Sequence, residues 1–303
     1  MHSFYTKDKS HEEEIKMKHK KWIPILAFAL LLGAAAVLYA LRPDLRFLTV
    51  QALTSPFRHV TVTETTVSDT SLRSVTLTEV QKDSSITYDQ SLLLINEAHP
   101  LKSDFSPSLC IYMDTPYRLN SCIVKQYEAL TSAVRVETGS SLYITSAART
   151  HDEQIEMKEE RPDVAADPGE SEHESGLAVD VCTNGFAGSA FLKSEAGQFV
   201  HEYGWRYGFI IRYPAGKSSV TGIPFEAWHL RYVGHPHAYI MHQNNLTLEE
   251  YIESLEPNKF YSACGYLISR QQGDTLRIPT RASHISVSPD NTGHYIITCR
   301  ISA

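Results

Sequence analysis

An apolar stretch near the N-terminus places the strongest constraint on how this chain can fold. The segment Trp22–Leu41 is apolar and contains no charged residue. A run of about 20 such residues is long enough to cross a bilayer as a helix. Basic residues are in excess on its N-terminal side: Lys16, Lys18, Lys20 and Lys21 precede it, and Arg42 and Arg46 follow. The positive-inside rule then predicts that residues 1–21 are cytoplasmic and that the chain after Leu41 is extracytoplasmic.

A cleaved signal peptide is the alternative interpretation of the same run. The apolar region of a signal peptide is shorter and ends in a small-x-small cleavage site. Here the run is long and ends at Tyr39-Ala40-Leu41-Arg42. We therefore expect an uncleaved single-pass anchor at residues 22–41, which would place the rest of the protein at the outer face of the cell membrane.

Charge and cysteine content narrow the function classes. The 303 residues carry a formal net charge of -7, which argues against a general nucleic-acid-binding surface. The five cysteines are an odd number, and none form a C-x-x-C motif of the kind found in zinc knuckles or thioredoxin-like sites. Cys264 and Cys299 lie near the C-terminal end and could form a disulfide.

The rest of the chain divides by composition into three parts. Residues 42–90 contain two alternating, strand-like segments, His59–Glu64 and Ser74–Val80, and we favour a polar stalk with some strand content over a small hairpin attached to the domain. A folded domain is expected at 91–256. Residues 257–303 predict a small all-β module that is marginal for folding alone, with strands at Tyr266–Ser269, Thr275–Ile278, Ile285–Val287 and Tyr295–Thr298.

Within residues 91–256 the sequence predicts alternating helices and strands, most of them from apolar spacing and one, at 151–160, as a polar helix that Pro162 ends. Helices are expected at Cys122–Glu137, His151–Glu160, Ala190–Tyr203 and Leu246–Leu255. Strands are expected at Leu142–Thr145 and Phe209–Ile211. Thr247 and Glu250 form a capping box at the start of the last helix.

Two short stretches of this domain carry chemistry. Ser171–Asp180 and Glu226–His229 offer His173, Asp180 and His229 as metal ligands, with Glu226 beside the last of them. Two imidazoles and one carboxylate make an open zinc site, and a nearby free glutamate can act as general base. We interpret 171–180 as a loop broken at Gly176 that leads into a strand. Glu226 and His229 could meet on a helical turn, a short strand or a bent loop.

The spacings alone are not specific, because the chain has 14 histidines and 35 acidic residues. The longer motifs around the two stretches are specific: Ser-x-His-x-x-Gly-x-Ala-x-Asp is followed by Glu-x-Trp-His-Leu-Arg-Tyr-Val-Gly. With these motifs and the segments Tyr207–Pro214 and Leu246–Tyr251, the chain resembles the zinc D-alanyl-D-alanine carboxypeptidases of the VanY type, which belong to the LAS-type metallopeptidases. The resemblance extends from about Leu92 to Glu256.

The resemblance implies an α+β fold, with a small central antiparallel sheet flanked by helices. It makes His173, Asp180 and His229 the zinc ligands and Glu226 the catalytic base. It also places Arg149 where it would meet the substrate, either at a C-terminal carboxylate or at the developing oxyanion. Two polar residues match positions near the bound peptide in the family: Gln154 and Ser171.

Two departures from the family pattern bear on specificity. Ala147-Ala148 stand before Arg149 where the family usually has an aromatic residue, and Ala227 replaces a proline beside Trp228. The leading hypothesis is a membrane-anchored zinc D,D-carboxypeptidase that acts on peptidoglycan stem peptides. The alternatives are an L,D-carboxypeptidase acting on the tetrapeptide and a non-catalytic peptidoglycan-binding module.

Three more histidines, His235, His237 and His242, follow the second stretch. They could suggest a second metal site. Because they lie after the motif in a segment expected to be a loop, we interpret them as a surface cluster.

Overall fold

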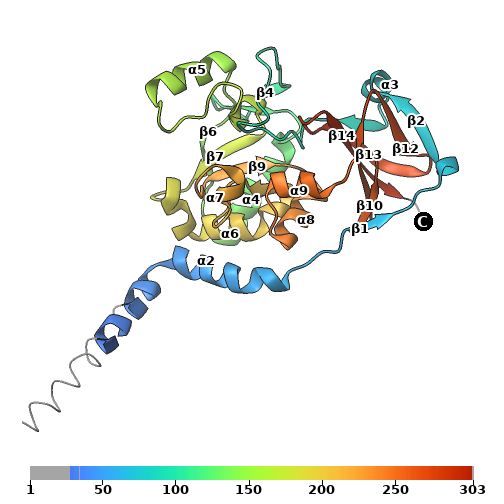
Figure 1. Cartoon of the computed structure of the whole chain (residues 1–303). Coiled ribbons are helices and arrows are strands. Elements are labelled where there is room, and N and C mark those ends of the chain that lie inside the picture. Colours follow the sequence, from blue (N-terminus) through green and yellow to red (C-terminus); the bar gives the residue numbers. More distant parts are fainter. Residues whose placement is uncertain (1–27, 34, 302–303) are drawn as a thin grey trace, which may run out of the picture. The chain divides into compact units, whose positions relative to one another are not determined.

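The computed structural model describes residues 28–33 and 35–301, which divide into two compact units, 1–50 and 51–303 (Figure 1). The first unit contains a helix at Phe28–Leu41 and most of α2 (Pro43–Thr54). No single helix of the described residues is long and apolar enough to cross a membrane. The bent pair Phe28–Leu41 and Pro43–Phe57 passes that test together. The expected cytoplasmic residues 1–21, and the first part of the expected anchor, lie outside the described residues.

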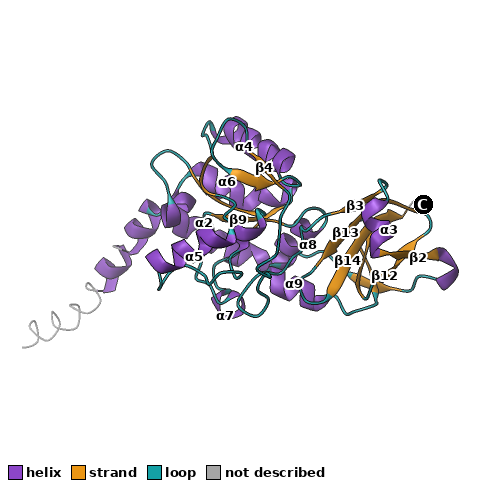
Figure 2. Cartoon of the chain, turned by 90° about the horizontal axis from the view of Figure 1, so that it is seen from above, coloured by secondary structure: helices purple, strands orange, loops and turns teal. Residues whose placement is uncertain are grey.

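The second unit has the expected α+β class, with several separate sheets and helices around them (Figure 2). Its central sheet is antiparallel, in the order β6-β7-β9-β8. These strands span Tyr143–Ser146 (β6), Ala178–Cys182 (β7), Phe209–Ile211 (β8) and His229–Tyr232 (β9). A two-stranded hairpin precedes them, made of β4 (Leu109–Ile111) and β5 (Arg118–Asn120).

The helices around the central sheet span Val124–Thr138 (α4), His151–Glu160 (α5), Glu195–Tyr203 (α6), Ser218–Thr221 (α7), His237–Asn244 (α8) and Leu248–Ser254 (α9). The helices α4, α5 and α9 begin and end close to their predicted bounds. The helices α7 and α8 were not predicted, and α8 lies where a loop was expected. The predicted Ala190–Tyr203 helix is divided, since a 3-10 segment at Gly188–Lys193 (η4) comes before α6. The predicted capping box of Thr247 and Glu250 at α9 is confirmed.

One face of the central sheet packs against helices and the other is left for polar residues. Val179 and Val181 of β7 and Leu230 of β9 lie in a buried core with Tyr127 and Leu130 of α4. Neighbouring residues on a strand point to opposite faces of the sheet. Asp180 lies between Val179 and Val181, and His229 precedes Leu230. The side chains of Asp180 and His229 therefore point to the face of the sheet opposite the helices.

A second, larger sheet draws its strands from both ends of the unit. It is six-stranded, in the order β1-β10-β11-β14-β13-β3, and a two-stranded sheet of β12 and β2 accompanies it. The C-terminal strands are Phe260–Ala263 (β10), Tyr266–Gln272 (β11), Thr275–Pro279 (β12), Ala282–Pro289 (β13) and His294–Ile301 (β14). We call these two sheets together the β module.

The segment expected to be a stalk belongs to this β module. Its strands are Thr63–Thr65 (β1), Leu72–Thr76 (β2) and Ile86–Tyr88 (β3), with a short helix at Leu77–Lys82 (α3). β1 and β2 pair antiparallel with β10 and β12, and β3 pairs parallel with β13. Isolated hairpins are marginal in water, so strands from this segment gain stability by joining the C-terminal sheet. The small C-terminal module is thus completed by residues from before the central sheet.

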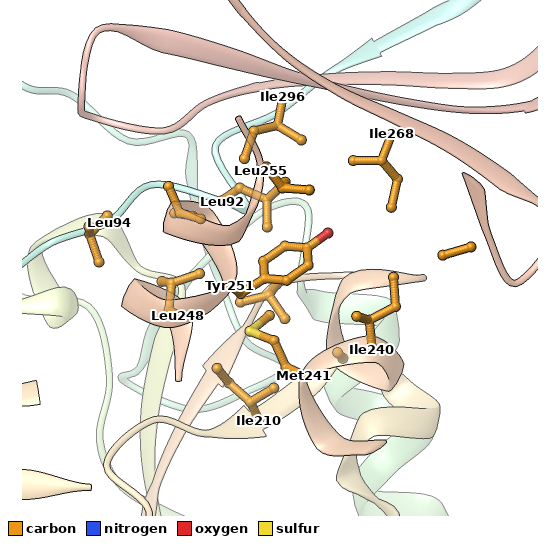
Figure 3. Close-up of a cluster of buried hydrophobic side chains, with 14 of the residues drawn as sticks. Leu92, Leu94, Ile210, Ile240, Met241, Leu248, Tyr251, Leu255, Ile268 and Ile296 are labelled. Carbon is orange, nitrogen blue, oxygen red and sulfur yellow. The ribbon is translucent and has the colours of Figure 1, made fainter. Parts of the chain in front are cut away.

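A shared apolar core joins the β module to helices α8 and α9 (Figure 3). Figure 3 shows side chains from several segments converging: Leu92 and Leu94, Met241 of α8, Tyr251 of α9, and Ile268 and Ile296 of the β module. The segment 91–95 leaves the β module after β3 and runs through this core. We call it the connecting segment.

The structure corrects two expectations about side chains. All five cysteines are free: Cys264 is exposed at the turn between β10 and β11, whereas Cys299 is buried in the core of the β module. His237 is not on the surface, since only 3% of it is exposed. Its two ring nitrogens lie 2.6 Å from the Tyr251 hydroxyl and 3.0 Å from the Thr298 hydroxyl.

Candidate active site

A short 3-10 turn followed by a strand positions the first two candidate ligands. His173 lies in η3 (Glu172–Ser175), and Gly176 ends this turn with a φ of 67°. A Cβ at Gly176 would lie 2.5 Å from Leu109 Cδ2 and 2.9 Å from the Asn120 amide nitrogen. Glycine therefore satisfies both the backbone conformation and the close packing. β7 begins two residues later and carries Asp180 in its middle.

The third candidate ligand comes from the neighbouring strand. His229 begins β9 and pairs directly opposite Asp180 of β7. Residues directly opposite in an antiparallel pair have close Cβ atoms. Glu226 lies in the turn just before β9, where its carbonyl accepts a hydrogen bond from the His229 amide at 3.4 Å. Of the possibilities left open by the spacing, the structure has a turn leading into a short strand.

His173, Asp180 and His229 each offer one ligand atom, and these atoms all lie within 4.8 Å of one another. His173 Nε2 is 3.3 Å from Asp180 Oδ2, and His229 Nδ1 is 3.0 Å from Asp180 Oδ1. Such separations suit a tetrahedral ion with ligand distances of about 2 Å. The two histidines are buried, so the donor atoms are held by packing as well as by the sheet.

The outer nitrogen of each imidazole has its own acceptor. His173 Nδ1 is 2.8 Å from the Ala147 carbonyl oxygen, and His229 Nε2 is 3.4 Å from Glu172 Oε2. Metal-binding histidines commonly donate their second N–H to a carbonyl or carboxylate in this way. Both rings can therefore turn an unprotonated nitrogen towards Asp180, and the residues present fit a metal ion.

The pKa values of the two carboxyl groups of the site, Asp180 and Glu226, are shifted in opposite directions. Burial alone would raise the pKa of Asp180, but His173 and His229 hold that pKa well below its usual range. Burial raises the pKa of the Glu226 carboxyl, and the His229 charge opposes this effect. The Asp180 carboxyl is therefore ionised, whereas Glu226 has a greater affinity for a proton. Glu226 Oε2 lies 3.8 Å from His229 Nδ1.

Arg149 lies next to this group. Its amide donates to the His173 carbonyl at 3.1 Å, and its side chain is half-buried. Burial lowers the pKa of Arg149, and Asp180 opposes that effect. Within the described part of the chain, the Arg149 Nε has no hydrogen-bond partner. The residue also lines a cavity of about 230 Å³, with Lys102, Phe105, Pro107, His151 and Glu174 among the other lining residues.

In the described part of the chain, the side chains of Gln154 and Ser171 make no hydrogen bond to the three candidate ligands. Gln154 is buried on α5, and its amide donates to the Ala166 carbonyl at 2.8 Å. Ser171 is buried just before η3, and its carbonyl accepts from the Glu174 amide. These contacts are those of residues that shape the loop 166–174. A substrate-binding role for either residue stays a prediction.

Comparison with known proteins places this site in a family. The family model described as VanY, D-alanyl-D-alanine carboxypeptidase, matches residues 116–235. A D-alanyl-D-alanine carboxypeptidase of Enterococcus faecium is 31% identical over 249 residues, which cover 74% of this chain and 78% of that protein. The chain belongs to the VanY family of D-alanyl-D-alanine carboxypeptidases.

One solved structure shares the fold of this VanY-family chain. The vancomycin-resistance D,D-dipeptidase VanXYg, bound to a D-Ala-D-Ala phosphinate analog, aligns with a TM-score of 0.59 and 24% identity, covering 76% of this chain and 98% of that one. A mutant of the vancomycin-resistance D,D-pentapeptidase VanY in complex with Zn(II) is 31% identical, with a TM-score of 0.49, and covers 54% of this chain and 98% of that one.

The VanY-family site contains one charged group that the sequence interpretation missed. Glu172, whose side chain is fully buried, contacts His229 and two buried arginines, Arg212 and Arg231. An acidic residue beside a histidine in a polar stretch looks like a solvent-exposed residue. The sequence did contain a signal for this buried charge. Arg212 directly follows the apolar run Phe209–Ile211, and Arg231 lies within the apolar run Leu230–Val233. A buried arginine requires a buried anion.

Proposed function

We propose that this chain is a zinc-dependent D,D-carboxypeptidase that removes the terminal D-alanine from peptidoglycan stem peptides. The observation that carries the proposal is the convergence of His173, Asp180 and His229, with the Glu226 carboxylate beside them. Family membership supplies the D-Ala-D-Ala substrate class. The three residues would hold the zinc ion.

Glu226 is the proposed general base. Bound zinc would lower the pKa of a water molecule and polarise the scissile carbonyl. Glu226 accepts the proton of the attacking water and then donates it to the departing amine. Its raised pKa supports this role, because a carboxylate that binds a proton more readily is a better base near neutral pH.

Arg149 is the proposed substrate-binding and charge-stabilising residue. Its amide donates to the His173 carbonyl, its guanidinium interacts electrostatically with Asp180, and the residue lines the 230 Å³ cavity, with its Nε unpaired within the described residues. A planar fork of N–H donors suits either the C-terminal carboxylate of the peptide or the oxyanion that develops during attack. Gln154 and Ser171 are proposed to contact the same peptide.

The proposed location is the outer face of the cell membrane, with residues 22–41 as a single-pass anchor. The uncharged apolar run and the lysines before it support this topology. Peptidoglycan is an extracytoplasmic polymer, so the topology would place the enzyme beside its substrate. A test is protease treatment of intact spheroplasts, in which the part after residue 41 should be digested and a tag fused before residue 1 should survive.

The reaction is tested by incubating the full-length protein with defined stem peptides and identifying the products by mass spectrometry. We expect loss of one D-alanine from the pentapeptide, abolition of cleavage by a chelator, and recovery on addition of zinc. Cleavage of the tetrapeptide instead would make the chain an L,D-carboxypeptidase. Binding of either peptide without any cleavage would make it a peptidoglycan-binding module.

A further inference from the structure

Glu172 occupies an unusual place for a carboxylate. Its side chain has 0% exposure, yet in the described structure its carboxylate contacts charged or ionisable side chains. One oxygen, Oε1, accepts from Arg212 Nε at 2.6 Å and from Arg231 at 2.5 Å. The other oxygen, Oε2, faces His229 Nε2 at 3.4 Å. The arginines thus fix one oxygen and leave the other for the histidine.

The two arginines are themselves anchored on their far sides. Arg231 donates to the carbonyl oxygens of Ser91 and Leu93 in the connecting segment, at 3.2 and 2.7 Å. Arg212 makes a two-bond pair with Glu249 at the start of α9, at 2.9 and 2.5 Å. Both arginines are fully buried. Because buried charges are costly unless paired, these contacts leave Glu172 little freedom to move.

We propose that Glu172 is a positioning residue that orients His229 for metal binding, and that the connecting segment supports it through Arg231. The proposal rests on the zinc site proposed above. When Nε2–H donates to Glu172, the lone pair of Nδ1 points to Asp180, where the ion would bind. The β module, from which the connecting segment enters, then contributes to the metal site without providing a ligand.

The alternative is that Glu172 only neutralises two buried arginines. In that case its removal would lower the stability of the fold, and any folded protein would bind zinc as before. If Glu172 orients His229, its loss frees the imidazole to rotate. Partners of this kind typically contribute about 10–100-fold in metal affinity. Zinc affinity measured separately from stability therefore distinguishes the two roles.

The test compares the full-length protein with its Glu172→Gln variant. The zinc dissociation constant is measured by competition with a chromophoric chelator, and the melting temperature is measured on the metal-free forms. We expect the variant to bind zinc about 10–100-fold more weakly. The matched control is Gln271→Ala, which removes buried hydrogen bonds to the Ser269 hydroxyl and to the Arg277 backbone inside the β module. It should lower the melting temperature and leave the zinc constant within about twofold of the wild type, because the Gln271 side chain bonds neither the ligands, nor Glu172, nor the connecting segment in the described structure.

Glu172→Asp is the second variant, for use if the glutamine variant does not fold. It retains the negative charge for the arginines but shortens the side chain by one methylene, so it should fold and still bind zinc more weakly. Wild-type zinc affinity in either folded variant would overturn the positioning role. If the wild-type protein itself binds no zinc, the proposed metal site fails and the role of Glu172 fails with it. That result is distinct from tight wild-type binding that is unchanged in the variants.

Discussion

Glu226 is the residue whose substitution should separate chemistry from metal binding. Glu226→Gln removes the proton acceptor but none of the three ligands. We expect the turnover rate to fall about 10²–10⁴-fold, the usual contribution of a general base, while zinc stoichiometry stays at one. Steady-state kinetics on the pentapeptide and metal analysis of the same sample check this expectation.

Glu159→Gln is the control for that substitution, since Glu159 is exposed near the end of α5. Its rate should match the wild type. If the Glu226 variant retained full activity, another group would have to take the proton, and the assignment of the base would be wrong.

Arg149 provides a second prediction, based on the shape of its side chain. Arg149→Lys keeps the positive charge but loses the planar fork. We expect the kcat/KM for the pentapeptide to fall about 10²–10³-fold, as when a charge-stabilising donor is removed from an active site.

A peptide with an amidated C-terminus distinguishes whether Arg149 binds the terminal carboxylate or stabilises the oxyanion. If Arg149 binds the terminal carboxylate, wild type and variant should cleave the amide equally slowly. If it stabilises the oxyanion, the variant should be slower on both peptides by the same factor.

At the level of single residues, the sequence predicted which side chains would come together at the candidate metal site. It did not predict the buried charges that contact them. His173, Asp180, His229 and Glu226 belong to two short stretches whose wording is specific. The contact between Glu172 and His229 joins a side chain of the turn η3 to one of strand β9, and it depends on how the fold brings that turn and that strand together. Local sequence does not report that pairing, so the buried charges became visible only in the fold.

Among the elements, the turn η3 should be the most sensitive to a small change. Gly176→Ala adds a methyl group where the backbone φ is 67° and where Asn120 and Leu109 are already in contact range. We expect a loss of unfolding free energy of at least about 2 kcal/mol, because the strain of the left-handed conformation adds to a steric clash. Urea denaturation of the metal-free protein measures this loss.

Gly139→Ala is the matched control, since Gly139 ends α4 with a φ of 68° and a Cβ there would meet nothing within 4 Å. It carries the strain without the clash, so the loss should be about 1 kcal/mol. Equal losses in the two variants would show that packing around Gly176 adds nothing.

Most helices and C-terminal strands could be predicted because their signals are local. Apolar spacing predicted α4, a polar stretch ended by Pro162 predicted α5, and strand-like segments separated by turn residues predicted β11, β12, β13 and β14. The segment 42–90 was harder, because its strands pair with partners at the other end of the unit. Part of the expected Ser74–Val80 strand is the helix α3, whose capping box at Thr76 and Glu79 outweighs its alternating pattern.

At the scale of the whole unit, His237 should make stability depend on pH. It is buried between α8, α9 and β14, and burial lowers its pKa to about 3. In the unfolded chain a histidine has a pKa of about 6.5, so the unfolded state binds a proton first as the pH falls. Stability should therefore be full above about pH 6.5 and fall by about 2–3 kcal/mol by pH 4.5.

His237→Gln isolates this contribution. His201 and His242, whose pKa values burial lowers to about 4, add to the acid sensitivity and remain in the variant. The variant should be less stable at pH 7.5 and lose less stability than the wild type between pH 7.5 and 4.5, as measured by thermal unfolding. An unchanged pH slope would assign the acid sensitivity to the other groups.

The shared core of Figure 3 predicts that residues 51–303 unfold as one cooperative unit. Leu92, Tyr251 and Ile296 come from three different parts of the unit and are all nearly fully buried in it. Thermal unfolding followed by tryptophan fluorescence and by far-ultraviolet circular dichroism should give coincident transitions. Two separate transitions would show that the β module melts independently.

If the β module supports His229 as proposed, it also sets when, during synthesis, the enzyme can become active. Thr63 pairs with Ser262, so β1 cannot meet its neighbour until β10 has been synthesised. Such distant pairing is slow to form. If the connecting segment must be seated before His229 is held correctly, a nascent chain still emerging from the ribosome would carry its ligands but not a competent hydrolase. The need to synthesise β10 to β14 first would then delay hydrolysis of the cell wall.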